Sequence, residues 1–558
     1  MPPNLPPFQI LASDGTITDI YALPSWGLDG SVLMGIYEDM VTARLLYEFG
    51  KNEGHSERMT LFIGPLWQEA VISTVYALGE NTWIYPYGRQ WHTALARGVS
   101  IKSILDGFYG NPSSEAIKDF HGHHVRPPYV VVGAQLLPAV GAAWASKILE
   151  QKIVPTATYF GDGATAQGDF HGAMSHAKIH QVPTILFCEN NQYAISTHVS
   201  LNSPTKNLAD RARGYDIVAL RVDGNDLFAC FAAAKWAYEY ALATSEPVFV
   251  ELVTYRGGEH TTAVGEIIKI PAAEKAEAEK NEPLIRTRSF LSSRYAKEIF
   301  GIDWNDSRDE SLKEKLRAVI KKAGEQSYRE FTEAKKMGRE LVKKTASWLE
   351  TPRVDPHYKN LARSGVAMKK LYAEDIDKGF AVRDAIGIAA FDAMLADQRV
   401  IWIGQDVGRS GGVNRTSAVA QRFAREESAV KKLLPGFEDN ILRMYLPLGS
   451  IFPRRVIDMP LNEAAIAGIG FGLSLGDGDK CRARPIIEVQ FSGFVRLMLH
   501  QIEEHSRHHY RTQTLDIAPG VYLLPSGVGE RIEFHRDVEL SLFTNNPALI
   551  VAFPSTPQ

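Results

Sequence analysis

The sequence contains very little cysteine. Its 558 residues include only Cys188, Cys230 and Cys481, which lie far apart along the chain. Three scattered thiols cannot build a disulfide framework or a zinc site with paired cysteine spacing. So few cysteines are typical of proteins from a reducing compartment. We therefore expect a cytoplasmic protein whose fold does not depend on disulfides.

Long apolar runs and a leader sequence are also missing. The longest apolar stretches, near residues 136–145 and 464–475, are far shorter than the roughly 20 residues that a membrane-spanning helix needs. The first residues, MPPNLPPFQI, have no basic head followed by an apolar segment, which a signal peptide would have. We therefore expect no membrane span and no export.

Neither sign of charge is in large excess. Lys and Arg number 61 and Asp and Glu number 65, so the formal net charge is −4. Nucleic-acid scaffolds and polybasic membrane binders carry a strong positive excess, so we expect no nucleic-acid partner and no membrane partner. The 45% of apolar residues is enough for a packed core, which excludes disorder as the main state.

The sequence does contain two stretches in which short β-branched runs alternate with helical patterns. This alternation is typical of βαβ units and a parallel sheet. The strand candidates are TATYF (156–160), TILFC (184–188), IVALRV (217–222), VFVELVTY (248–255), VIWIGQDV (400–407), RVIDMP (455–460), IIEVQF (486–491), VYLLP (521–525) and LIVAFP (549–554). We predict an N-terminal arm over residues 1–30, a first α/β module with C-terminal helices over 31–350, a linker over 351–377 and a second α/β module over 378–558.

Two segments differ from this alternation. Residues 309–347 are charged, with apolar residues at helical spacing, and predict a long surface helix or a pair of helices. Residues 424–455 are mixed and charged, and we interpret them as an insertion into the second module.

The strongest chemical signal is the pair YFGDGATAQGDF (159–170) and ILFCENNQYAIST (185–197). One predicted strand ends near Asp162 and the next ends near Asn191, and the carboxyl ends of parallel strands share one edge of a sheet, where ligands bind. A carboxylate, an amide oxygen and a nearby carbonyl suit Mg²⁺, and the glycines let the backbone approach phosphate oxygens. A second GDG at 476–478 has no such partner at this spacing, and we interpret it as a plain turn.

These motifs resemble the diphosphate and magnesium site of thiamine diphosphate enzymes. With VVVGAQLLPAVGAA (130–143), RVDGND (221–226) and TYRGGEH (254–260), the first module is similar to the alpha subunit of 2-oxo acid dehydrogenases, the decarboxylating first component of the pyruvate and branched-chain complexes. The second module resembles the beta subunit through IGQDVGRSGGV (403–413), MPLNEAAIAGIGFGLSLG (459–476) and IEVQFSGF (487–494). The resemblance implies an α/β fold of two thiamine diphosphate-binding modules, with parallel sheets flanked by helices, fused in one chain.

The resemblance also implies which residues bind thiamine diphosphate and Mg²⁺. Asp162, Asn191 and the backbone carbonyl of Tyr193 match the ligands of Mg²⁺, and Arg89 matches an arginine that grips the diphosphate. The family has Tyr-Arg where this chain has Gly-Arg, so the aromatic partner is lost or is displaced to Tyr87. The other implied cofactor-binding residues are Gly133, Gly161, Gly163 and Ala164, with Gln490 and Phe494 around the pyrimidine ring.

Three residues are implied in catalysis. Glu463 matches the glutamate that hydrogen-bonds the aminopyrimidine and promotes loss of the thiazolium proton, although a glutamate in the first turn of a helix is also common for dipole reasons. His260 matches the histidine beside the diphosphate and the substrate, and His535 aligns with the beta-subunit histidine near the substrate carboxylate. Gln405 stands where the family usually has glutamate.

The implied reaction is decarboxylation of a 2-oxo acid and reductive acylation of the lipoyl group of a partner acyltransferase. Branched-chain 2-oxo acids such as 3-methyl-2-oxobutanoate are slightly favoured, because fused chains resemble that group. Pyruvate is close behind, because VVVGAQ resembles pyruvate-type alpha subunits.

Two other classes of function stay open. One is a transketolase-like thiamine diphosphate carboligase, which needs a basic phosphate cluster at the substrate mouth. The other is a non-catalytic, cofactor-binding remnant, because the beta subunit usually continues into a further α/β domain and this chain ends at FPSTPQ. In this family the cofactor lies between modules of the two types, usually across a subunit interface, so a homodimer is implied.

Overall fold

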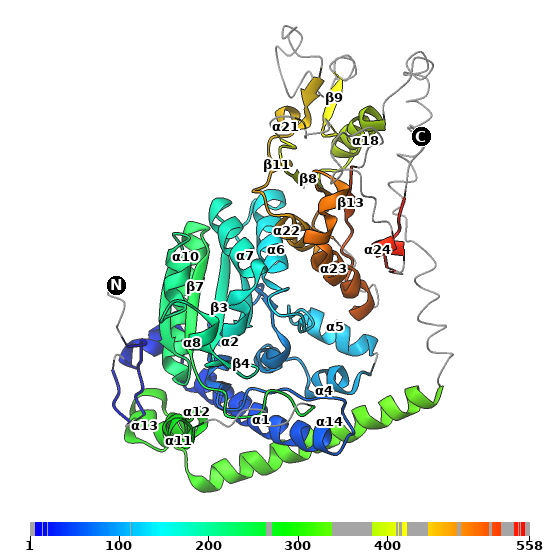
Figure 1. Ribbon diagram of the computed structural model, residues 1–558. Coiled ribbons are helices and arrows are strands. Elements are labelled where there is room, and N and C mark those ends of the chain that lie inside the picture. Colours follow the sequence, from blue (N-terminus) through cyan, green and yellow to red (C-terminus); the bar gives the residue numbers. More distant parts are fainter. Residues whose placement is uncertain are drawn as a thin grey trace. The chain divides into compact units, whose positions relative to one another are not determined.

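The structure is a computed structural model, and it divides into two compact units (Figure 1). The first unit comprises Met1–Ala143 and Lys152–Met337, and the second comprises Trp144–Gln151 and Gly338–Gln558. The structure describes residues 6–13, 15–18, 20–111, 113–263, 271–337, 382–408, 411, 416–420, 445–476, 481–512, 516–525, 541–544, 546 and 548–552. The linker predicted at 351–377 and most of the insertion predicted at 424–455 lie outside these residues.

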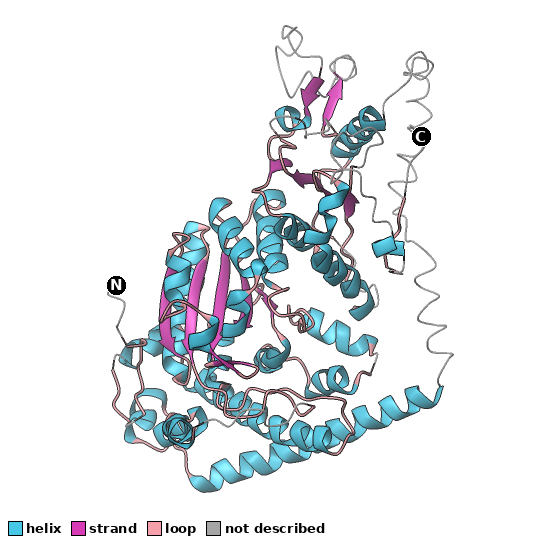
Figure 2. Cartoon of the chain, viewed as in Figure 1, coloured by secondary structure: helices cyan, strands magenta, loops and turns pink. Residues whose placement is uncertain are grey.

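The first unit is built on a five-stranded parallel sheet with the strand order β1-β2-β3-β7-β6. The strands are β1 (Trp83–Tyr85), β2 (Thr156–Gly161), β3 (Thr184–Asn190), β6 (Val218–Asp223) and β7 (Val248–Val253). Almost every side chain of β2, β3 and β7 is buried, because helices flank the sheet (Figure 2). Such fully covered parallel strands read as continuous apolar runs, which is why β2, β3 and β7 are among the predicted strands, and β6 is predicted as well although it is only partly buried.

Helices and short strands complete the first unit, although the residues of α6 (Leu136–Leu149) from Trp144 onward are grouped with the second unit. They are η1 (Ile20–Trp26), α1 (Gly30–His55), η2 (Glu69–Val71), α2 (Ile72–Tyr76), η3 (Gly88–Gln90), α3 (Trp91–Ala96), α4 (Ile101–Tyr109), α5 (Ser114–Gly122), α6 (Leu136–Leu149), η4 (Asp162–Ala166), α7 (Gly168–Ile179), β4 (Tyr193–Ala194), β5 (Thr197–His198), α8 (Val199–Asn202), α9 (Ala209–Arg213), α10 (Leu227–Thr244), α11 (Ala272–Lys280), α12 (Pro283–Leu291), α13 (Arg294–Phe300) and α14 (Asp306–Met337).

Asp226 connects the N-terminal arm to the sheet. Its Oδ1 accepts hydrogen bonds from the backbone of Phe228 and Ala229 and caps α10, and its Oδ2 accepts two more, each 2.7 Å long, from the backbone of Ile10 and Leu11. Within the arm, residues 20–26 form the 3₁₀ helix η1.

The segment predicted as a long helix or a helix pair is one helix, α14, as far as the structure describes it. The hydroxyl of Tyr37 on α1 donates a 2.6 Å hydrogen bond to Asp309 at its start. Leu316 and Ile320 are buried, so one face of α14 packs into the core and the other face carries the charges.

The second unit contains a four-stranded parallel sheet with the strand order β11-β8-β12-β13. The strands are β8 (Val400–Gly404), β11 (Val456–Asp458), β12 (Arg484–Glu488) and β13 (Val521–Leu523), and β9 (Ala418–Ala420) and β10 (Tyr445–Pro447) form a separate antiparallel pair. The helices are α18 (Val382–Ala396), α21 (Leu448–Ile451), α22 (Glu463–Ser474), η6 (Ser492–Leu497), α23 (Leu499–Arg511) and α24 (Ser541–Thr544).

One predicted strand of the second unit is wrong where it is described. Residues 549–552 of LIVAFP form no strand, and Ile550 is 80% exposed. An apolar run becomes a strand only where another strand accepts its hydrogen bonds, and no strand pairs with this segment among the described residues. The predicted class, α/β with parallel sheets flanked by helices, is confirmed in both units (Figure 2). None of the helices in the described ranges combines the length and the apolar character that crossing a bilayer requires.

Candidate functional site

In the first unit, the carboxyl ends of four parallel strands bring together residues that are distant in the sequence. Arg89 follows β1, Asp162 follows β2, Asn191 follows β3, and His260 lies in the segment after β7. Because all these strands run in the same direction, the four residues lie along one edge of the sheet.

Asp162 has a carboxylate oxygen without a hydrogen-bonding partner among the described residues. The side chain is 1% exposed, and its Oδ2 is buried. Burial raises the pKa of Asp162 to about 6, although Arg256 and Arg89 act in the opposite direction. The backbone carbonyl of Asp162 accepts hydrogen bonds from Thr165 and Asn202, which hold the loop in place. A buried carboxylate oxygen that lacks a donor suits a cation.

Asn191 and Tyr193 supply two further oxygens at this edge. Asn191 donates from Nδ2 to Oε1 of Gln68 at 3.0 Å, and its Oδ1 accepts a 3.3 Å hydrogen bond from the backbone of Tyr193. The carbonyl of Tyr193 accepts a 3.3 Å hydrogen bond from Nη1 of Arg256. The described residues contain no cluster of three or more His, Cys, Asp or Glu side chains suited to a metal. A cation here would therefore depend on one carboxylate, one amide and one carbonyl.

Arg89 and His260 are in direct contact. Nη2 of Arg89 donates to the backbone carbonyl of His260 at 3.1 Å and lies 3.4 Å from its Nδ1, while Nη1 donates to the carbonyl of Gly64 at 2.7 Å. Burial, reinforced by the charges of Arg89 and Arg256, lowers the pKa of His260 to about 4, so the imidazole is neutral at pH 7. Two arginines beside a neutral histidine suit an anionic group such as a diphosphate.

Tyr87 lies beside Gly161. Its hydroxyl is 3.8 Å from the position of a Cβ on Gly161, and it donates a 3.2 Å hydrogen bond to Oε2 of Glu189. Burial raises the pKa of Glu189 to about 8. An aromatic side chain therefore accompanies Arg89, two positions before it in the sequence.

Small residues let the backbone pass closely through the site. A Cβ on Gly163 would lie 2.7 Å from the Cβ of Ala194, so only glycine fits there. Gly133, with φ of +84°, occupies the left-handed region that favours glycine. Ala164 is buried next to Gly163.

Three residues at this edge are not among those that the sequence predicts: Gln68, Glu189 and Arg256. Glu189 and Arg256 lie inside the stretches CENNQYAIST and TYRGGEH, and each directly follows a predicted strand, so the sequence does indicate their position. Gln68 lies in an unremarkable LWQEA sequence, and only its contact with Asn191 reveals it.

The second unit repeats this arrangement at its own sheet edge. Gln405 follows β8, Glu463 follows β11, and Gln490 and Phe494 follow β12. Glu463 is the first residue of α22 and is 8% exposed. Nε2 of Gln405 donates to Oε1 of Glu463 at 3.4 Å. Because an amide nitrogen can only donate, Glu463 is the acceptor in this hydrogen bond.

Glu488, at the end of β12, is a further buried acid that is not predicted from the sequence. It accepts hydrogen bonds from Nε1 of Trp402 at 3.0 Å and from Oγ1 of Thr416 at 2.6 Å. Burial raises its pKa to about 7. His535, a predicted catalytic residue, lies outside the described residues.

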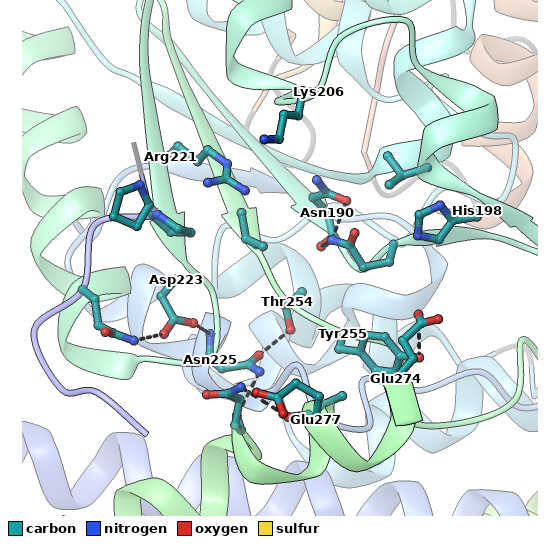
Figure 3. Close-up of a pocket in the computed structure, with 18 residues that line it drawn as sticks. Asn190, His198, Lys206, Arg221, Asp223, Asn225, Thr254, Tyr255, Glu274 and Glu277 are labelled. Carbon is teal, nitrogen blue, oxygen red and sulfur yellow. Dashed lines mark hydrogen bonds between the residues drawn. The ribbon is translucent and has the colours of Figure 1, made fainter. Parts of the chain in front are cut away.

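A separate cavity of about 650 Å³ opens at the carboxyl ends of β3, β6 and β7, between the N-terminal arm and α11 (Figure 3). Its charged lining residues are Lys206, Arg221, Asp223, Glu274 and Glu277. Each of these three carboxylates already has partners: Asp223 binds Gln9 and Arg286, Glu274 accepts from the hydroxyls of Tyr193 and Tyr255, and Glu277 binds Lys280. None of the predicted site residues lines this cavity.

Comparison with known proteins identifies two families along the chain. The family described as dehydrogenase E1 component matches residues 37–335, and the family described as transketolase, pyrimidine binding domain, matches residues 378–558. The chain is 31% identical over 321 residues to the pyruvate dehydrogenase E1 component subunit alpha of Staphylococcus aureus, which covers 56% of this chain and 82% of that protein. It is 34% identical over 261 residues to the 3-methyl-2-oxobutanoate dehydrogenase subunit alpha of Mycobacterium tuberculosis, which covers 47% of this chain and 70% of that protein.

Proposed function

Because the chain belongs to the dehydrogenase E1 component family, we propose that it decarboxylates a 2-oxo acid and passes the acyl group to the lipoyl group of a partner acyltransferase. The match to a pyrimidine-binding domain in the same chain implies thiamine diphosphate as the cofactor. When bound, this cofactor supplies the nucleophilic carbon and the electron sink that the decarboxylation requires. The protein supplies orientation, electrostatics and proton transfer.

The observation that carries the proposal is the buried oxygen of Asp162, which has no hydrogen-bonding partner within the described ranges and lies beside Arg89. Asp162, Asn191 and the carbonyl of Tyr193 would hold Mg²⁺, and Arg89 with the backbone at Gly163 and Ala164 would hold the diphosphate. The donor set fits Mg²⁺, which takes hard oxygen ligands and keeps positions open for phosphate oxygens. Neutral His260 can donate to or accept from a substrate without adding charge.

Glu463 is proposed to hold and release the proton that the pyrimidine ring needs. Its first-turn position on α22 and its near-complete burial keep the carboxylate in one place. Gln405 holds one oxygen of Glu463, which leaves the other oxygen for a ring nitrogen. Gln490 and Phe494, which follow β12 on the other side of β8, are proposed to contact the same ring.

The proposed substrate is a branched-chain 2-oxo acid such as 3-methyl-2-oxobutanoate, with pyruvate as the second candidate. Relatives of both kinds match the chain, at 34% and 31% identity respectively. We further propose the module limits 31–350 and 378–558, a homodimer and a cytoplasmic location, the last because the three cysteines are buried free thiols.

A screen of 2-oxo acids with an artificial electron acceptor tests the proposal, run with and without thiamine diphosphate and Mg²⁺. We expect reduction of the acceptor that requires both cofactors and is fastest with one of the two proposed substrates. Carboligation of sugar phosphates without acceptor reduction would identify the chain as a transketolase-like enzyme. Cofactor binding without turnover of any 2-oxo acid would identify a non-catalytic remnant.

A further inference from the structure

One irregular segment of the first unit, residues 61–68, contacts the loops that meet at the sheet edge, and we name it the strap. The carbonyl of Gly64 accepts from Arg89. The carbonyl of Leu66 accepts a 3.1 Å hydrogen bond from the backbone of Gly257, and that of Trp67 accepts a 3.0 Å hydrogen bond from Oγ1 of Thr254. The strap therefore connects Arg89 to the segment that follows β7.

The strap is held in a conformation that its sequence does not favour. Trp67 has φ of +68°, in the left-handed region that bulky residues rarely adopt. Its ring packs directly on Gly257, where any Cβ would overlap it. Such strained positions persist only when their surroundings fix them, and they cluster at functional sites. The residue that follows this strained position is Gln68.

Gln68 is completely buried and contacts the predicted metal ligand Asn191. Its Oε1 accepts the 3.0 Å hydrogen bond from Nδ2 of Asn191. The two ends of an asparagine amide have nearly the same shape but opposite hydrogen-bonding character. An oxygen acceptor at Gln68 selects the nitrogen end of Asn191, so the oxygen end points the other way. If the Asn191 amide rotated by half a turn, it would present its NH₂ group to the cation and its oxygen to another oxygen.

We propose that Gln68 is a positioning residue that orients the amide oxygen of Asn191 toward the bound cation. This inference rests on the proposed function, because Asn191 is a metal ligand only there. Gln68 does not itself contact the metal in this arrangement. It acts as the hydrogen-bonding partner that fixes a ligand, and removing such partners typically weakens metal binding about 10–100-fold.

The amide nitrogen of Gln68, Nε2, is a hydrogen-bond donor that a ligand could use. Nε2 of Gln68 is buried and has no hydrogen-bonding partner within the described part of the chain. An unmade hydrogen bond of a buried donor is costly. An oxygen of the diphosphate would satisfy this donor. Gln68 would then contact both halves of the bound metal–diphosphate group, through Asn191 on one side and directly on the other.

Binding of Mn²⁺ in place of Mg²⁺ tests the proposal, because Mn²⁺ is followed by electron paramagnetic resonance without any turnover. In the full chain with saturating thiamine diphosphate, Gln68→Met should weaken Mn²⁺ binding about 10–100-fold. Gln68→Glu keeps the acceptor for Asn191, so its Mn²⁺ affinity should stay close to that of the wild type. The same Gln68→Glu variant should lose affinity for thiamine diphosphate, because a carboxylate oxygen replaces the amide donor of Gln68.

The controls separate this role from general damage and from failure of the proposed function. Gln501→Met removes a fully buried glutamine of the second unit and should leave Mn²⁺ binding unchanged. Wild-type-like Mn²⁺ affinity in Gln68→Met, or equal losses in Gln68→Met and Gln68→Glu, would overturn the role of Gln68. A wild-type chain that binds Mn²⁺ and cofactor but turns over no 2-oxo acid would overturn only the proposed function. A wild-type chain that binds neither would overturn both.

Discussion

The carboxylate of Asp162 is suited to bind a cation, but without the cation it lowers the stability of the fold. One oxygen of this carboxylate is buried without a donor among the described residues, and burial raises the pKa of Asp162 to about 6 against the opposing charges of Arg256 and Arg89. Without a cation, keeping the group ionised at pH 7 disfavours the folded state. Residues that bind ligands often carry such a cost, because the ligand supplies the missing partner.

Replacing Asp162 by Asn should therefore separate binding from stability. Asp162→Asn keeps the shape but removes the charge that attracts Mg²⁺, so calorimetric titration with thiamine diphosphate and Mg²⁺ should detect no binding. The free energy of unfolding of the cofactor-free chain should not fall and should rise by up to roughly 1–3 kcal/mol. Wild-type-like cofactor affinity in the variant would exclude Asp162 as a ligand.

Glu463 gives a second test at the scale of a single residue. Glu463→Gln keeps volume and hydrogen bonding but cannot exchange a proton with the pyrimidine ring. General acid–base groups contribute about 10²–10⁴-fold in rate, so hydrogen–deuterium exchange at the thiazolium carbon of bound cofactor should slow at least about a hundredfold. Thermal unfolding should stay unchanged. If exchange in the variant is as fast as in the wild type, Glu463 has no role in proton transfer and is only the first residue of α22.

At the scale of elements, Asp226 links the start of α10 to the N-terminal arm. One carboxylate accepts four backbone hydrogen bonds, two from the helix and two from residues 10 and 11. The arm also pairs with β6, where the backbone of Phe8 donates to Arg221 and accepts from Asp223. The arm is therefore fixed to the edge strand of the first unit's sheet.

Asp226→Ala should lower the free energy of unfolding by about 2–4 kcal/mol, because a helix cap and two buried acceptors are lost together. Urea unfolding of the full chain measures this loss. Asp29→Ala is the matched control, because Asp29 caps α1 through Ser31 and Val32 at an exposed position, whereas the hydrogen bonds from residues 10 and 11 go to Asp226. If the two variants lose the same stability, the contacts of Asp226 with the arm contribute nothing.

The elements and the site differ in how far the sequence predicts them. β2, β3, β6 and β7 are predicted because apolar, β-branched runs fix their own local conformation. β1 is only three residues long and gives no such pattern. Asp162 and Asn191 are predicted because each belongs to a local motif at the end of a strand. Gln68 is not, because its role depends on a partner 123 positions later in the chain.

At the scale of the whole molecule, two sets of buried titratable groups oppose each other as the pH falls. Histidines with lowered pKa values stabilise the fold only while neutral, so their contribution is present above about pH 6.5 and is lost on acidification. Acids with raised pKa values act in the opposite direction, because the folded state binds their protons more tightly. The histidines are His92 and His505, with pKa values of about 3, and His176, at about 4. The acids include Asp162 and Asp226, at about 6, Glu488, at about 7, and Glu189, at about 8.

A comparison of the wild type with His505→Gln measures the contribution of one of these histidines. His505 is 4% exposed, bonds the carbonyl of Ala518 and the hydroxyl of Tyr522, and stacks on Phe471. His505→Gln should destabilise the chain most at pH 7.5. The gap to the wild type should shrink by about 2 kcal/mol at pH 5, because only the wild type must keep an imidazole neutral. Denaturant unfolding at both pH values measures the gap, and a constant gap would contradict the lowered pKa of His505.

The fit between Trp67 and Gly257 constrains how this sequence can change over evolutionary time. Gly257 cannot gain a side chain while the indole ring fills the space above it. Trp67, with its left-handed backbone, could be exchanged for glycine with relief of strain, and that exchange would open the space. The two positions should therefore vary together among related sequences. Chains with a small residue at position 67 should tolerate alanine or serine at position 257, whereas chains with an aromatic residue there should keep glycine.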